Sequence, residues 1–145
     1  MAAAVAGRRA MSSAEQAVRA RTLAVLKADA ALAELVHGVF DGVPPRASTP
    51  YVSVGTAEGS DWGTKDRAGR EVRLSLTLHG QGAGVEDGAA GRIEGLVSGL
   101  RGAGEGWAIV GARVVRTRFA FAREGGWRHE MVVRCRCLAG GAEDG

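Results

Sequence analysis

The stretch Glu71–His79, EVRLSLTLH, alternates apolar and polar side chains without a break. Val or Leu stands at every even position from Val72 to Leu78, and Arg, Ser and Thr stand between them. Successive side chains of a β-strand point to opposite faces of the sheet. The pattern therefore predicts a strand with one buried face and one face in water, typical of an antiparallel sheet covered on one side only.

Two longer stretches near the C-terminus continue this sheet. Residues 107–123 and 127–138 also alternate, and the Glu-Gly-Gly sequence at 124–126 predicts a turn between them. In the first strand we expect one face to carry Val115, Thr117, Phe119 and Phe121, and the other to carry Val114, Arg116 and Arg118. In the second strand we expect one face to carry His129, Met131, Val133, Cys135 and Cys137, and the other to carry Arg128, Glu130, Arg134 and Arg136.

Shorter strands are expected upstream. Tyr51, Val52 and Val54 follow Pro50 and predict a strand, while residues 39–45, VFDGVPP, predict a short strand or bend that the prolines end. Residues 60–69 are polar and punctuated by glycine, which indicates a loop or hairpin turn.

Helices are predicted on either side of these strands. Glu15 lies three residues after Ser12, the spacing of a capping box, so a helix should run to about Ala28. Its expected apolar stripe is Val18, Ala24, Val25 and Leu32, widened by Leu23 and Leu26. Asp29 should cap a second, short helix over residues 30–36.

A further helix is predicted before the last two strands. Its apolar face is Ile93, Leu96, Val97 and Leu100, with the spacing i, i+3, i+4, i+7. Gly88, Gly91, Gly95 and Gly99 weaken this helix, so it needs tertiary packing, and we expect these small residues to allow close approach to the sheet.

The order of elements predicts an α+β fold, an antiparallel or mixed sheet of four to five strands with two main helices on one face. We expect a single domain over residues 12–138, with a disordered N-terminus at 1–11 and a disordered tail at 139–145. Met11 offers an alternative start, and the N-terminus lacks the pattern of a signal peptide.

Charge and cysteines restrict the possible functions. The 19 basic and 16 acidic residues give a net charge of +3, too small by itself to indicate a nucleic-acid-binding protein. Cys135 and Cys137 lie two apart on one strand face, near the limit for a disulfide, and are expected to be buried thiols. With His129 they match no common zinc spacing.

The sequence contains no pattern that indicates catalysis or a cofactor. Gly80, Gly82 and Gly84 follow a strand, but Val85 and Asp87 stand where a dinucleotide fingerprint needs its third glycine. Ser53 and Ser75 are predicted on strands without an evident His–Asp partner. We therefore expect neither an enzyme nor a bound cofactor or metal.

One loop stands out as a candidate binding site. Trp62 is expected in a polar loop together with Asp61, Lys65, Asp66 and Arg67. Trp and Arg are enriched where protein partners dock. The loop therefore predicts either an interface anchor or a tryptophan that folds back onto its own sheet, and the sequence leaves both open.

Taken in order, these segments resemble a known family. The run includes LKADAALAELV, VFDGVP, PYVSVG, the Asp-Trp-Gly-Thr-Lys loop, RLSLTL and the closing VRTRFAFAREGGWRHEMVVRCR. Over residues 16–138 the chain resembles the DUF3168 family of small phage and prophage proteins, most of all its member in gene transfer agents. It departs from the family at HGQGAG, where members often have an aromatic residue. It also departs in the glycine-rich helix that precedes the last two strands.

The resemblance implies a structural role. Such proteins are similar to phage tail terminators, which form a hexameric ring that caps the tail tube, stops its polymerisation and meets the head–tail connector. It implies assembly in the cytoplasm, a final place at the head–tail junction, no membrane partner and no catalytic residues.

The residues suggest how such a ring would be used. The arginines Arg116, Arg118, Arg134 and Arg136 are expected to line a lumen through which DNA passes without specific binding. The loop at Asp61–Arg67 is expected to contact a neighbouring copy or the tube. The alternatives are a head–tail connector of the same particle and, less favoured by the few aromatic residues, a small DNA-binding domain.

Overall fold

The computed structural model describes residues 12–82, 87–123 and 125–140. Its helices are α2 (Ala14–Ala28), α3 (Ala30–Ala33) and α4 (Asp87–Ser98). Its strands are β1 (Val39–Asp41), β2 (Tyr51–Asp61), β3 (Gly69–Gln81), β4 (Gly102–Gly104), β5 (Trp107–Phe121) and β6 (Gly126–Ala139). The predicted disorder of residues 1–11 and most of the predicted disordered tail lie outside the described residues.

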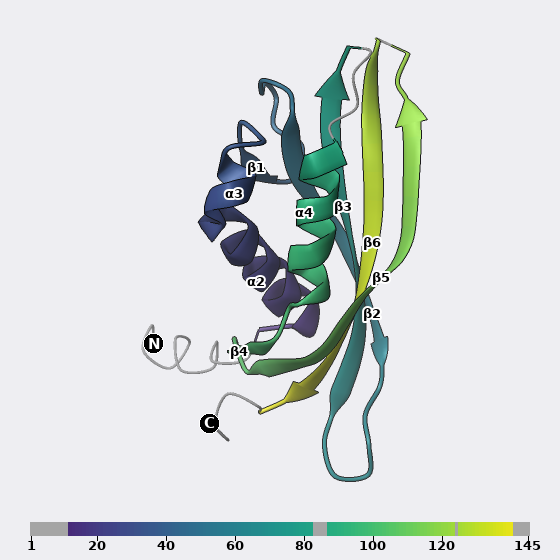
Figure 1. Cartoon of the computed structure of the whole chain (residues 1–145). Coiled ribbons are helices and arrows are strands. Elements are labelled where there is room, and N and C mark those ends of the chain that lie inside the picture. The colour runs from purple at the N-terminus through teal and green to yellow at the C-terminus, as the bar shows by residue number, and fades with distance from the viewer. Residues whose placement is uncertain (1–11, 83–86, 124, 141–145) are drawn as a thin grey trace, which may run out of the picture.

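The strands form one sheet in the order β1-β2-β3-β6-β5-β4. β1 runs parallel to β2, and every other neighbouring pair is antiparallel. The helices lie on one side of this sheet (Figure 1), which confirms the predicted α+β class. The predicted four to five strands become six because β4, a segment that the sequence did not indicate as a strand, pairs with the start of β5.

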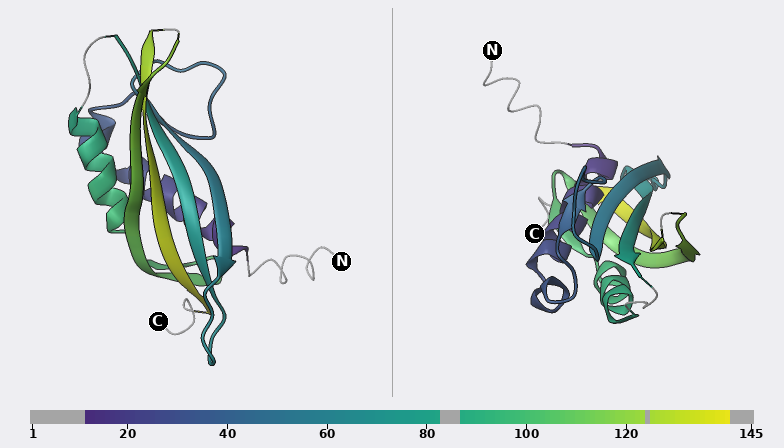
Figure 2. Two further views of the ribbon diagram at one scale, coloured as in Figure 1. Left: turned by 90° about the vertical axis from the view of Figure 1, so that its right-hand side faces the viewer. Right: turned by 90° about the horizontal axis from the view of Figure 1, so that it is seen from above.

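The buried core lies between the helices and one face of the sheet. The β3 side chains Val72, Leu74, Leu76 and Leu78 are each 1% exposed or less, as the alternation predicted. On β6 the predicted face is also buried from Met131 to Cys137. The sheet curls, so that α2 contacts β1 and β2 as well as β5 (Figure 2).

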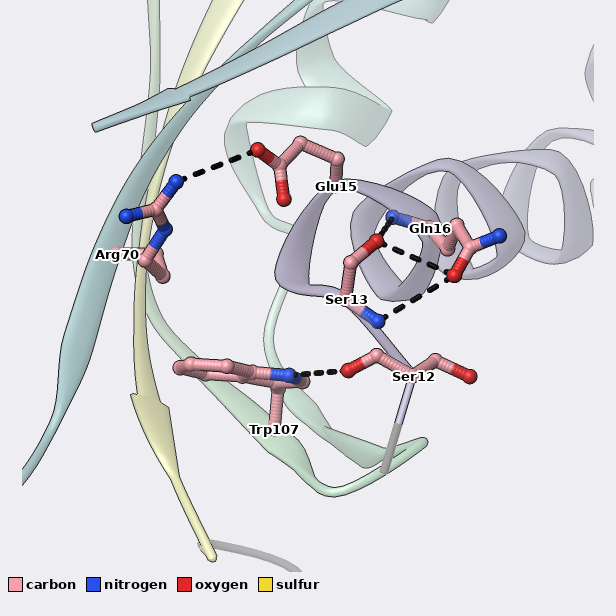
Figure 3. Close-up of polar contacts among 6 residues, drawn as sticks. All are labelled: Ser12, Ser13, Glu15, Gln16, Arg70 and Trp107. Atoms are coloured by element: carbon pink, nitrogen blue, oxygen red, sulfur yellow. Dashed lines mark hydrogen bonds and ion pairs between the residues drawn. The ribbon is translucent and has the colours of Figure 1, made fainter. Parts of the chain in front are cut away.

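The capping box of α2 is shifted by one residue from its predicted position. Ser13, not Ser12, is the N-cap: its Oγ accepts a hydrogen bond from the Gln16 amide at 3.1 Å, and Gln16 Oε1 accepts from the Ser13 amide (Figure 3). Glu15 instead forms an ion pair with Arg70 on β3 at 3.5 Å. The Trp107 indole donates to the Ser12 carbonyl oxygen at 2.7 Å, which fixes the start of α2 against β5.

The predicted stripe of α2 was also partly wrong. Ala24 is exposed, and Thr22 is buried with its hydroxyl donating to the Val18 carbonyl oxygen at 2.8 Å. Val18, Thr22 and Leu26 follow each other at four-residue spacing, so they share one helix face. A buried threonine can replace an apolar residue there because its own helix satisfies its hydroxyl.

Asp29 is the predicted cap of α3, and the structure confirms it. Its carboxylate accepts a hydrogen bond from the Leu32 amide at 2.8 Å. The helix is shorter than predicted and ends at Ala33, although Leu32 and Val36 are both buried.

The alternation predicted for β5 is broken by two bulges, one between Ile109 and Gly111 and one between Val114 and Arg116. A bulge inserts one extra residue and reverses the faces beyond it. Val114 therefore lies opposite the buried Val133, whereas Arg113 shares the other face with Arg116. The prediction that Val114 lies on the face of Arg116 and Arg118 was wrong.

The apolar face of α4 is confirmed, but the role predicted for two of its glycines, Gly91 and Gly95, was wrong. Ile93, Val97 and Leu100 are buried. Gly91 and Gly95 are exposed, and a Cβ built on either would meet nothing within 4 Å, so they do not bring the helix close to the sheet.

Within the described part of the chain, no helix is long and apolar enough to cross a membrane.

Candidate assembly surfaces

The first surface is the sheet face that the helices leave uncovered, here called the open face. In the left view of Figure 2 the long strands face the viewer and the helices lie behind them. The predicted lumen residues Arg116, Arg118, Arg134 and Arg136 all lie on it. At its middle it is hollowed by about 590 Å³, in a space lined by β2, β3, β5 and β6 that includes Glu58, Arg73 and Arg116.

A row of like charges crosses the open face. In the strand register Arg73 lies opposite Arg134, and Arg134 lies opposite Arg113. Glu58 of β2 lies opposite Arg73 and ends the row on that side. Like charges directly opposite on neighbouring strands repel each other. At one end of the row Glu58 offsets the charge of Arg73, whereas Arg113 at the other end has no acidic residue opposite it within the described sheet.

The remaining arginines of the face are unevenly paired. Arg136 contacts Glu71 at 3.1 Å, and Arg118 contacts Glu130 at 3.4 Å. Among the described residues no ion pair joins Arg116 or Arg134. Exposed pairs of this kind add little stability, so the open face keeps a positive potential available to a partner.

The second surface is the hairpin loop between β2 and β3, which extends beyond the other strands (Figure 1). Its turn is held by Thr64, whose amide donates to the Arg67 carbonyl oxygen at 2.8 Å and whose hydroxyl accepts from the Arg67 amide at 3.1 Å. The strands flanking it are longer than predicted, because Ser60 and Asp61 still pair with β3.

The structure separates the five predicted loop residues into two groups. Trp62 is half-buried, with the Arg136 guanidinium carbon 5.3 Å from its ring centroid, and Arg67 donates to the Ala139 carbonyl oxygen at 2.6 Å. These two residues fix the loop to the end of β6. Asp61, Lys65 and Asp66 are exposed and form the part of the loop that a partner can reach.

One serine does have a histidine partner, which the sequence did not indicate. Ser53 Oγ lies 2.9 Å from His79 Nε2, and the His79 ring stacks on Tyr51 with centroids 4.4 Å apart. Burial, together with the nearby Arg128, lowers the pKa of His79, so its ring is neutral at physiological pH. Ser53 is 4% exposed, so a substrate cannot reach its hydroxyl, and the contact is best explained as packing.

The cysteines are buried thiols, as predicted. Burial raises the pKa of Cys135 to about 12 and that of Cys137 to about 11, so neither forms a reactive thiolate at neutral pH. The described residues contain no group of three His, Cys, Asp or Glu side chains that could hold a metal ion.

The third surface is the outer edge of β5, which sequence reasoning missed. Val110 and Val115, the two bulge residues, are 47% and 36% exposed, and Phe121 is 70% exposed. Phe119 contacts Phe121 and Trp127 at 5.2 and 5.6 Å between ring centroids. Apolar side chains at this exposed edge point to contact with another protein.

Comparisons with known proteins agree with an assembly role. The sequence matches the family described as "Tail completion protein gp17" over residues 16–139. Among solved structures 22 chains match. One belongs to the structure described as "Virion of native gene transfer agent (GTA) particle"; it is 27% identical, with a TM-score of 0.78, and the match covers 88% of this chain and 100% of that chain. No curated protein matches.

The family match extends from the first turn of α2 to the end of β6 and so includes the whole sheet. It confirms the expectation of a phage tail-completion protein, and we conclude that the chain belongs to the tail completion protein gp17 family.

Proposed function

We propose that this protein is the tail terminator of a phage-like particle, of the DUF3168 type that its sequence resembles. Six copies form a ring that caps the tail tube, ends its polymerisation and joins the tail to the head-side connector. The protein assembles in the cytoplasm and remains at the head–tail junction of the finished particle.

The observation that carries the proposal is the similarity to a chain of the gene transfer agent virion. The match covers all of that chain, so a protein with this domain and little else is part of a virion. In such a particle a small domain acts through its contacts with other proteins, and a repeated contact between copies closes into a ring when its rotation allows closure.

The open face suits the lumen of such a ring. Arg116, Arg118, Arg134 and Arg136 attract the phosphates of passing DNA, but Glu130 and Glu71 neutralise part of that charge. DNA affinity rises with the number of phosphates neutralised. A partly compensated face therefore lets DNA pass without holding it.

The hairpin loop suits contact with the tube. Its exposed tip, Lys65 and Asp66, extends along the strand direction, away from the helices (Figure 1). Because Trp62 and Arg67 attach the base of the loop to the domain, the tip is presented in a fixed place. A preformed loop loses little conformational entropy when it binds.

The test is the mass of the purified protein over a range of concentrations, measured by light scattering with and without polymerised tail tube. We expect a sixfold mass, and tubes capped at one end in electron micrographs. Lys65→Asp should reduce capping, whereas the same charge change at the exposed Lys27 of α2 should leave capping unchanged.

Other outcomes would replace the proposal. A strict monomer that leaves tube length unchanged contradicts it. Binding to the connector but not to tubes would make the protein a neck component, and DNA affinity that falls steeply with salt would favour a DNA-binding domain.

A further inference from the structure

We propose that neighbouring copies join edge to edge, with β5 of one copy pairing with β2 of the next, so that one continuous sheet runs around the ring. This inference rests on the proposed ring and names the contact that closes it. The proposed contact involves the two strand edges and not the hairpin loop, which would project along the ring axis towards the tube.

Both edges have unpaired backbone within the described part of the chain. β4 pairs only with Trp107–Ile109, which leaves the rest of β5 without a partner on its outer side. β1 pairs only with Val52–Val54, and Arg19 donates to the carbonyl oxygens of Val54 and Gly55. From Thr56 to Asp61 the outer side of β2 is free.

These two free stretches lie at the same level of the sheet. Following the register across β3 and β6 connects Ser60 with Gly111, Glu58 with Arg113, and Ala57 with Val114. β2 and β5 also run in opposite directions, because three antiparallel pairings separate them. A level contact between residues 57–60 of one copy and residues 111–114 of the next would therefore be antiparallel, like the other long-strand pairs of the sheet. Within these residues it would meet neither β1 nor β4.

The charges of the two edges are complementary. On the open face the β5 edge carries Arg113, Arg116 and Arg118, and the free part of β2 carries Glu58. In a level contact Glu58 of the next copy lies beside Arg113. The row Glu58–Arg73–Arg134–Arg113 then has an acidic residue at both ends. Opposite charges facing each other across strands stabilise a pair.

This complementarity identifies the occupant as a second copy of this chain. Each copy carries both halves of the contact, so the pairing is head-to-tail and repeats around a ring. Bulges and arginines can also protect an edge against pairing. Here, however, the bulge residues are the exposed Val110 and Val115, and such apolar side chains do not protect an edge.

The experiment is disulfide cross-linking of the full chain carrying Glu58→Cys and Arg113→Cys. Within one copy these positions are separated by about three strand spacings, or about 14 Å, which is too far for a disulfide. Any bond must therefore join two copies. The native Cys135 and Cys137 can stay, because both are 0% exposed.

The matched control carries Glu58→Cys and Arg118→Cys. Arg118 is exposed on the same edge and face but lies about four rows, or about 13 Å, further along β5. We expect oxidation of the 58/113 variant to give a ladder of dimers and larger species at least about tenfold faster than the control, because only close Cα atoms can be bridged.

Equal rates, or no ladder in either variant, overturn the inference. The mass of the reduced variants, measured in parallel, separates the two proposals. A sixfold mass without the selective ladder means that the ring closes through another surface, whereas a monomer that also fails to cap tubes means that the terminator proposal itself is wrong.

Discussion

Trp62 shows how a residue with the character of an interface anchor can instead serve its own domain. The tryptophan packs beneath Arg136, and its neighbour Arg67 bonds to the last residue of β6. The sequence left both readings open because the answer depends on where β6 ends, a contact across more than seventy positions. What remains for a partner is the exposed tip at Lys65 and Asp66.

The position of a helix cap is testable at the same scale. Ser13→Ala should lower the free energy of unfolding by about 1 kcal/mol, within a usual range of about 0.5–2, because it removes the hydroxyl that accepts from the Gln16 amide. Urea denaturation followed by circular dichroism measures the change.

The control is the adjacent serine. Ser12→Ala removes only an exposed hydrogen bond to Glu105, so its effect should be smaller than that of Ser13→Ala. A larger loss in Ser12→Ala would show that the cap lies where the sequence alone first placed it.

At the scale of elements, strands were predictable where alternation is regular. β3 and β6 have the faces that their patterns indicate. β5 does not, because an extra residue at Val115 changes which side chains share a face, and a bulge leaves no distinct trace in a sequence of valines and arginines. β2 was predicted too short because Ser60 and Asp61 look like loop residues until β3 pairs with them.

The assembly surfaces were predictable to a similar degree. Strand spacing correctly placed Arg116, Arg118, Arg134 and Arg136 on one face. The free edge of β5 could not be found in this way, because it exists only where β4 stops after three residues. An edge is a property of the whole sheet, whereas alternation is a property of one strand.

Asp29 connects three helices and gives their packing a pH dependence. It follows α2, caps α3 and forms an ion pair with Arg92 of α4. Hydrogen bonds from Arg92 and then from the Leu32 amide lower the pKa of Asp29 from 3.8 to about 2. A carboxyl with a lowered folded-state pKa stabilises the fold above its ordinary pKa and loses this effect as pH falls towards the folded value.

Arg92→Gln should therefore raise the pKa of Asp29 and weaken the fall in stability between pH 4 and pH 2, since the larger of the two hydrogen-bond effects is gone. The Leu32 amide should keep the pKa somewhat below its ordinary value. Carboxyl carbon chemical shifts recorded during an NMR pH titration measure it. Lys27→Gln removes a charge that does not contact Asp29 and should leave the pKa of Asp29 unchanged. An unaltered Asp29 pKa in Arg92→Gln would contradict the ion pair.

At the scale of the whole molecule, the arginine row makes stability and assembly oppose each other. In an isolated copy Arg73, Arg134 and Arg113 stand beside one another across three strands, which costs stability. In the proposed ring the neighbour's Glu58 compensates the exposed end of the row. The same residues that weaken the single copy would thus favour its association.

Arg113→Glu separates the two effects. In the isolated copy the introduced carboxylate would face Arg134, and the free energy of unfolding should rise by about 0.2–1 kcal/mol, because a repulsive cross-strand pair becomes attractive. In the ring the same carboxylate would face the neighbour's Glu58, so assembly should need a higher protein concentration. Urea denaturation of dilute protein measures the first change, and sedimentation velocity over a concentration series measures the second.

Arg46→Glu, at an exposed loop position, makes the same charge change and should alter neither quantity. A destabilised copy would contradict the arginine row, and unchanged assembly would mean that Arg113 lies outside the contact between copies.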